Sequence, residues 1–121
     1  MNKILYVDDE FINLQLFEIN LSRKYNVLIA SDGLAALDIL EKNPDIKVVI
    51  SDMRMPIMTG IEFIKKAKTK FKTIKYYILT GFDITQEIEE AINSGLIVKY
   101  FRKPFNLDEI DGEINKIIPA E

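Results

Sequence analysis

The sequence of 121 residues contains no cysteine, no histidine and no tryptophan. Without cysteine the chain can form no disulfide and no thiolate metal site, and it has no cysteine nucleophile. Without histidine it lacks the usual ligands of zinc and the base of serine-type catalytic triads. Any polar chemistry must therefore come from carboxylates, lysines and hydroxyl groups.

Long apolar segments are missing as well. No uninterrupted apolar run exceeds four residues, whereas a membrane helix needs roughly 20. The N-terminus holds one short apolar run, residues 4–7, followed at once by three acidic residues, a pattern that does not match a secretory signal. We therefore expect a cytoplasmic protein without a membrane partner.

Neither sign of charge dominates, because 16 basic and 19 acidic residues give a net charge of −3. Bulk charge therefore does not favour nucleic-acid binding. Six lysines between residues 65 and 75 form a basic cluster, but no aromatic platform accompanies them, so we expect a solvated surface there. Hydrophobic residues make up 48% and charged residues 29%, an ordinary globular composition. We expect residues 1–121 to form one domain.

Five short apolar segments alternate with longer helical patterns along the chain. Each is rich in β-branched or aromatic residues and ends in polar residues or glycine, as strands do. The five predicted strands are Lys3–Val7, Val27–Ala30, Lys47–Ser51, Tyr76–Thr80 and Val98–Phe101. Their near-continuous apolar character indicates strands that are covered on both faces, as in a parallel sheet.

Apolar residues at helical spacing predict helices between these strands. The last helical pattern follows Asn106, a good N-cap residue. The fourth pattern begins at Ile84 and ends at the stop signal Asn93-Ser94-Gly95. Five strand–helix units predict a doubly wound α/β fold, with helices on both faces of a parallel sheet.

Polar side chains stand at the ends of four of the five predicted strands. They are Asp8 and Asp9 after the first, Asp52 after the third, Thr80 in the fourth and Lys103 after the fifth. A single polar residue at a strand end is explained by the solvated loop that follows the strand, but this does not explain the whole set. Ligands of such folds bind at the carboxyl edge where the strand order reverses, so we expect the whole set to converge there.

The three acids need a counterion if they lie together. Two carboxylates about 5 Å apart repel each other by roughly 3 kcal/mol at an effective dielectric constant near 20. Oxygen ligands that are few and leave positions for water suit Mg²⁺ better than Ca²⁺. With Mg²⁺ and Lys103 supplying positive charge, Asp52 can be the nucleophile that accepts a phosphoryl group. The Thr80 hydroxyl and the main chain beside Gly81 can take further phosphoryl oxygens.

Over essentially all 121 residues the chain resembles the receiver domain of two-component response regulators, the group that includes the chemotaxis protein CheY. Four motifs, in order and at matching separations, make this resemblance specific. They are Val7-Asp8-Asp9-Glu10, Ser51-Asp52-Met53-Arg54-Met55-Pro56 with Gly60, Leu79-Thr80-Gly81, and Tyr100-Phe101-Arg102-Lys103-Pro104-Phe105. The resemblance implies a five-stranded parallel sheet of order 2-1-3-4-5 and a cis bond before Pro104.

The resemblance also implies roles for single residues. Asp52 would be the phosphoacceptor, and Asp9 and Asp52 would bind Mg²⁺ directly. Asp8 would bind it through water, and the main-chain carbonyl of Arg54 would complete the ligand set. Around the acceptor, the implied roles are a phosphoryl contact for Lys103, a switch hydroxyl for Thr80 and a switch aromatic for Tyr100.

Thr59 departs from the pattern common among receiver domains, and two further residues lie close to the predicted phosphorylation site in sequence. Thr59 stands where an aspartate often precedes Gly60, and we expect no chemical consequence. Arg54 and Phe82 follow Asp52 and Thr80 by two residues each, and we expect them to flank the path of water to an acyl phosphate. We expect both side chains to influence the lifetime of the phosphorylated form.

The function that follows is a phosphorylation-dependent signalling switch. A sensor histidine kinase or a histidine phosphotransfer protein would donate the phosphoryl group, since this chain has no histidine of its own. The chain would not be an enzyme acting on other substrates, although it would catalyse its own phosphorylation and autodephosphorylation. Phosphorylation would change the surface of the fourth helix, fifth strand and fifth helix. An output partner, a missing output domain or a second copy of the chain could read that surface.

Three other functions fit the residues less well. A haloacid-dehalogenase-type phosphohydrolase has a second acid two residues after its nucleophile, where this chain has Arg54. A flavodoxin-like FMN carrier needs a first loop that cradles phosphate, and Asp8-Asp9-Glu10 would repel it. The strongest alternative is a pseudo-receiver that binds partners without phosphorylation. Such proteins usually lose the acceptor, an acid or the lysine, all of which are present here.

Overall fold

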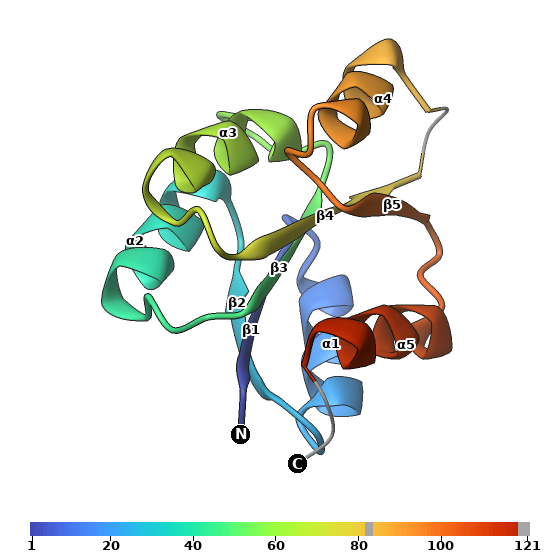
Figure 1. The fold of residues 1–121 in the computed structure, drawn as a ribbon. Helices are drawn as coiled ribbons and strands as arrows, with labels where there is room; N and C mark the ends of the chain where they lie inside the picture. Colours follow the sequence, from blue (N-terminus) through green and yellow to red (C-terminus); the bar gives the residue numbers. More distant parts are fainter. Residues whose placement is uncertain (82–83, 119–121) are drawn as a thin grey trace.

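The computed structural model describes residues 1–81 and 84–118, in which strands and helices alternate along the chain (Figure 1). The strands are β1 (Lys3–Val7), β2 (Asn26–Ala30), β3 (Val48–Asp52), β4 (Lys75–Thr80) and β5 (Lys99–Arg102). The helices are α1 (Phe11–Leu21), α2 (Gly33–Lys42), α3 (Gly60–Lys70), α4 (Gln86–Asn93) and α5 (Leu107–Ile117). All neighbouring strands are parallel, in the order β2-β1-β3-β4-β5, which confirms the predicted topology.

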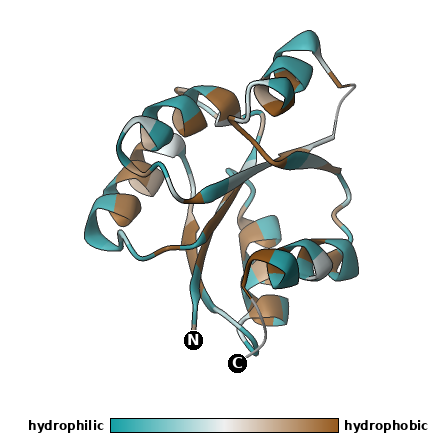
Figure 2. Cartoon of the chain, in the orientation of Figure 1, coloured by the Kyte–Doolittle hydropathy of each residue, from teal (hydrophilic) through white to brown (hydrophobic). Residues whose placement is uncertain are grey.

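Helices cover both faces of the sheet and bury a separate apolar layer on each. On one face α1 and α5 pack against the sheet through Phe17, Ile110 and Ile114. On the other face α2, α3 and α4 pack through residues that include Phe63 and Ile88. The helices carry both hydrophobic and hydrophilic residues (Figure 2), and α1 also exposes apolar side chains, among them Phe11, Ile12 and Ile19. Burial on both faces explains why the strands are near-continuous apolar runs.

The predicted strands agree with the observed ones to within one residue at each end. The fourth helix differs, because Ile84 was expected to open it and α4 begins at Gln86. The side chain of Thr85 accepts a hydrogen bond from the Ile88 amide and so caps the helix one residue after Ile84. Asn106 caps α5 as predicted, by accepting from the Glu109 amide.

Thr59 has a structural role that we did not expect. Its side chain accepts from the Glu62 amide, and the Glu62 carboxylate accepts from the Thr59 amide. This reciprocal capping box satisfies two amides at the start of α3. Because α3 begins eight residues after Asp52, the cap fixes the end of the loop that follows Asp52.

The lysine-rich segment is a solvated surface, as predicted. Five of its six lysines are exposed and the other, Lys68, is half-buried. Lys70 forms a salt bridge with Glu41 of α2 at 2.6 Å. Among the helices of residues 1–81 and 84–118, none is both long enough and apolar enough to cross a bilayer.

Candidate functional site

The sheet brings the predicted site residues to one edge. β1 and β3 are neighbours with Val7 opposite Ser51, so Asp8 and Asp9 follow β1 beside Asp52 at the end of β3. β4 lies between β3 and β5, with Thr80 opposite Arg102. Lys103 therefore emerges next to the acids, and its amide donates to the Thr80 carbonyl at 2.8 Å. This convergence follows from the strand order.

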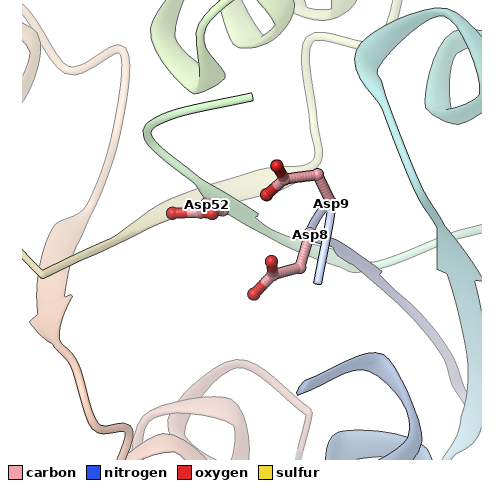
Figure 3. Close-up of side chains that lie close together, drawn as sticks. All are labelled: Asp8, Asp9 and Asp52. Carbon is pink, nitrogen blue, oxygen red and sulfur yellow. The ribbon is translucent and has the colours of Figure 1, made fainter. Parts of the chain in front are cut away.

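Asp8, Asp9 and Asp52 form a cluster at this edge (Figure 3). Each residue offers a carboxylate oxygen, and these oxygens all lie within 4.8 Å of one another. Asp8 is fully buried and Asp52 is 5% exposed, whereas Asp9 is exposed. The cluster is therefore open to solvent on the Asp9 side and closed toward the sheet.

The ammonium group of Lys103 faces the two buried acids. Its Nζ lies 3.1 Å from Oδ2 of Asp52 and 3.7 Å from Oδ2 of Asp8. The Lys103–Pro104 peptide bond is cis, as predicted. Gly81 lies beside the Lys103 side chain, and a Cβ at this glycine would meet Lys103 Cβ and Cδ at 3.6 Å.

The carboxylate of Asp8 is held by three groups that the sequence analysis did not identify. Oδ2 accepts from the Tyr6 hydroxyl at 2.5 Å and from the Asn13 amide group at 3.2 Å. Oδ1 accepts from the main-chain amide of Glu10 at 2.9 Å. Together with Lys103, these donors fix the orientation of a fully buried carboxylate.

Burial and nearby negative charge change the protonation of Asp52. Burial, followed by the negative charge of Asp8, raises the pKa of Asp52 from 3.8 to about 6, although Lys103 opposes the rise. Burial by itself would lower the pKa of Lys103, but the hydrogen bond to Asp52 and the charges of Asp52 and Asp8 raise it overall. Lys103 is therefore protonated at neutral pH, yet its single charge does not neutralise the acids.

The donor set suits a hard divalent cation. Three carboxylates offer oxygen ligands, and one of them is exposed and can share a cation with water. Burial, followed by the charge of Asp8, raises the pKa of Asp52 despite Lys103, so a further cation beside Asp52 would favour its ionised form. Residues 8, 9 and 52 therefore fit Mg²⁺ in both chemistry and charge.

The other predicted site residues lie around this cluster. Thr80 is buried at the end of β4, and Arg54 is exposed in the loop after β3. Phe82 lies outside the described residues. Tyr100 is half-buried in β5 opposite Ile78, with its ring 5.8 Å from the Arg102 guanidinium. Tyr100 also lines a cavity of about 520 Å³ over β5 and the adjoining helices.

A second cavity, of about 450 Å³, adjoins the cluster. It lies between the start of α1 and the loop that carries Lys103, and Asn13, Leu16 and Phe105 line part of it. Lys103 contributes to its wall and also reaches Asp52. This cavity therefore lies next to the Lys103–Asp52 pair.

Comparisons with known proteins agree with this geometry. Residues 4–115 match the family model of the response regulator receiver domain. The sporulation initiation phosphotransferase F of Bacillus subtilis is 38% identical over 121 residues, which cover 98% of this chain and 95% of the relative. A chemotaxis protein CheY homolog of Campylobacter jejuni is 32% identical over 120 residues, covering 96% and 92% of the two chains. The crystal structure of a response regulator receiver domain protein from Clostridium thermocellum superposes with a TM-score of 0.90 at 32% identity, covering 98% and 94%.

Proposed function

Because the chain belongs to the response regulator receiver family, we propose that it is a phosphorylation-dependent switch with Asp52 as the phosphoryl acceptor. Receiver domains are signalling proteins of two-component systems rather than classical enzymes. One observation carries the assignment to Asp52. This carboxylate lies 3.1 Å from the Lys103 ammonium group and within a cluster of three acids that suits a divalent cation.

Four groups of this chain would hold Mg²⁺. They are the carboxylates of Asp9 and Asp52, the main-chain carbonyl of Arg54, and Asp8 acting through water. When bound, the cation supplies positive charge beside the phosphoryl oxygens and lets the acids lie together. The chain's own contribution is to keep the acceptor oxygen oriented and deprotonated beside Lys103.

The transfer itself needs little covalent chemistry from the protein. An Oδ atom of Asp52 attacks the phosphorus of a phosphohistidine on a sensor kinase or phosphotransfer protein. The new O–P bond replaces the N–P bond, and the donor imidazole leaves. The Lys103 ammonium group stabilises the charge on the phosphoryl oxygens as the transfer proceeds.

The phosphorylated state would then be read at a surface of α4, β5 and α5. The Thr80 hydroxyl would turn toward the phosphoryl group, and Tyr100 would take up the space that becomes free. The cavity beside Tyr100 is lined by residues of α4, β5 and the start of α5. It would give the Tyr100 side chain room to change its orientation at this surface. An output partner would distinguish the two states there.

A small-molecule phosphodonor tests the acceptor directly. We expect the protein incubated with acetyl phosphate and Mg²⁺ to gain one phosphoryl group, measured by intact mass spectrometry. Asp52→Asn should gain none, whereas Asp45→Asn, an exposed control, should match wild type. No adduct on wild type under saturating Mg²⁺ would contradict the switch and favour an interaction module that works without phosphorylation.

Arg54 should affect how long the phosphoryl group persists. Its exposed side chain lies two residues after the acceptor, where it can block or orient the attacking water. We expect Arg54→Ala to change the rate of dephosphorylation after the phosphodonor is removed, followed by mass spectrometry over time. An unchanged rate would show that the side chain plays no part in hydrolysis.

A further inference from the structure

Tyr6 contacts the acid cluster from inside the protein. It lies in β1, two residues before Asp8, and its side chain is fully buried. Residues two apart in a strand point to the same face of the sheet, so the Tyr6 ring extends beneath Asp8. Its hydroxyl donates to Oδ2 of Asp8 at 2.5 Å.

Aromatic contacts hold the Tyr6 ring in place. The ring stacks on Phe17 of α1, with centroids 4.3 Å apart and planes at 17°. The edge of Phe105 meets it at 6.2 Å and 74°, and Phe105 belongs to the loop that carries Lys103. A ring held by both neighbours cannot swing away, so the hydroxyl is fixed under the carboxylate.

The hydroxyl acts on the oxygen that Lys103 also approaches. Oδ2 of Asp8 lies 3.7 Å from the Lys103 ammonium group, which is 3.1 Å from Asp52. By occupying Oδ2, Tyr6 meets part of the demand of Asp8 for donors and leaves Lys103 closer to Asp52. The same bond fixes the orientation of a carboxylate that belongs to the proposed cation site.

We propose that Tyr6 is a positioning residue whose hydroxyl orients Asp8 and thereby sets the Mg²⁺ affinity of the site. The inference rests on the proposed function, because it assumes that the three acids bind Mg²⁺. It assigns Tyr6 a role that goes beyond filling the core. A carboxylate that is already oriented loses less freedom when the hydrated cation binds than one that must be ordered.

The alternative is that the hydroxyl only satisfies its own need for a partner, as buried polar groups generally do. Tyr76 provides the matched case within this chain. It is also fully buried in a central strand, and its hydroxyl donates to the Phe71 carbonyl at 2.8 Å, away from the acids. Removing either hydroxyl leaves a phenylalanine of nearly the same shape.

The experiment compares Tyr6→Phe and Tyr76→Phe in the metal-free, unphosphorylated protein. Mg²⁺ is titrated while amide chemical shifts are followed by NMR, which gives the dissociation constant for each protein. We expect Tyr6→Phe to weaken Mg²⁺ binding by several-fold, less than the roughly tenfold loss that is usual for a partner of a direct metal ligand, because Asp8 would act through water. Tyr76→Phe should bind Mg²⁺ as wild type does.

A metal-free readout and a double mutant locate the effect at Asp8. The Glu10 amide donates to the other oxygen of Asp8, so Tyr6→Phe should speed its hydrogen exchange while Tyr76→Phe does not. In an Asp8→Ala background, where the carboxylate is gone, Tyr6→Phe should no longer change the Mg²⁺ affinity.

Equal Mg²⁺ affinity for wild type and Tyr6→Phe would overturn the positioning role, as would equal weakening in both tyrosine variants. Either result would leave the proposed phosphorylation of Asp52 intact, since that is measured separately by mass. A wild-type protein that binds no Mg²⁺ would overturn this inference together with the cation part of the proposed function.

Discussion

Replacing Asp52 by asparagine removes one negative charge from a buried, crowded cluster, and we expect it to stabilise the metal-free protein at neutral pH. In the folded protein, burial and the charge of Asp8 raise the pKa of Asp52 from 3.8 to about 6. Ionising this carboxylate therefore costs more in the folded chain than in the unfolded chain. An asparagine has no such cost.

The size of the effect follows from linkage between proton binding and folding. Between pH 3.8 and about 6 the folded protein binds more protons than the unfolded chain, so its stability falls as pH rises through this range. At about 1.4 kcal/mol per pKa unit, the full penalty is about 3 kcal/mol near pH 7.5 and about 1 kcal/mol near pH 4.5. In the Asp52→Asn variant the side-chain amide accepts a weaker hydrogen bond from Lys103 than the carboxylate does. This loss reduces the stability advantage of the variant by an amount that does not vary with pH in this range.

Urea unfolding at these two pH values measures the free energy of unfolding of both proteins. The difference between Asp52→Asn and wild type should be largest near pH 7.5 and should shrink by about 2 kcal/mol near pH 4.5. Saturating Mg²⁺ should reduce the advantage of the variant, because the cation stabilises wild type by binding its folded state.

Asp111→Asn is a control of opposite sign. The hydrogen bond from Lys24 lowers the pKa of Asp111, so this carboxylate stabilises the fold at neutral pH and loses that effect as pH falls. The control variant should therefore be less stable than wild type near pH 7.5. If Asp52→Asn is no more stable than wild type there, or if its advantage does not shrink in acid, then burial and the charge of Asp8 do not disfavour ionisation of Asp52 as inferred.

Other expectations concern the loop between Asp52 and α3. Ile57 has a left-handed φ of 76°, which strains its backbone, and its side chain is 74% exposed. Ile57→Gly should therefore raise the free energy of unfolding by about 1 kcal/mol in urea titration. A decrease would show that the backbone of Ile57 is not strained. A Cβ on Gly60 would lie 2.3 Å from the Asp52 carbonyl oxygen. Gly60→Ala should therefore lower the free energy of unfolding by about 2 kcal/mol and weaken Mg²⁺ binding. Wild-type values for both would show that the loop moves aside to make room for the added methyl group. Thr59→Ala removes the cap of α3 and should lower the free energy of unfolding by about 1 kcal/mol in thermal or urea unfolding. Unchanged stability would show that water satisfies the Glu62 amide as well as the hydroxyl does.

Most of the site could be predicted because it depends on strand ends rather than on side-chain packing. Asp8 follows β1, Asp52 ends β3 and Lys103 follows β5, and parallel strands all end at the same edge of a sheet. Once the strand order is 2-1-3-4-5, their proximity is a matter of topology. The predicted cation site and the lysine beside it need no further structural information.

Other features depend on details that a single sequence does not specify. Tyr6 lies in a run of apolar residues buried on both faces of the sheet, so periodicity cannot separate it from its neighbours. The left-handed conformation of Ile57 has no sequence signal, since isoleucine disfavours it. Thr59 did have one, because threonine followed three residues later by glutamate is the signature of a capping box.

The most direct test of the phosphorylation switch is to map the phosphoryl group to a single residue. The protein is incubated with acetyl phosphate and Mg²⁺, the acyl phosphate is reduced with borohydride, and peptides are sequenced by mass spectrometry. Reduction converts a phosphorylated aspartate to homoserine, and we predict this change at Asp52 alone. Homoserine at Asp8 or Asp9, or at no aspartate while wild type binds Mg²⁺, would contradict the assignment of Asp52 as the acceptor.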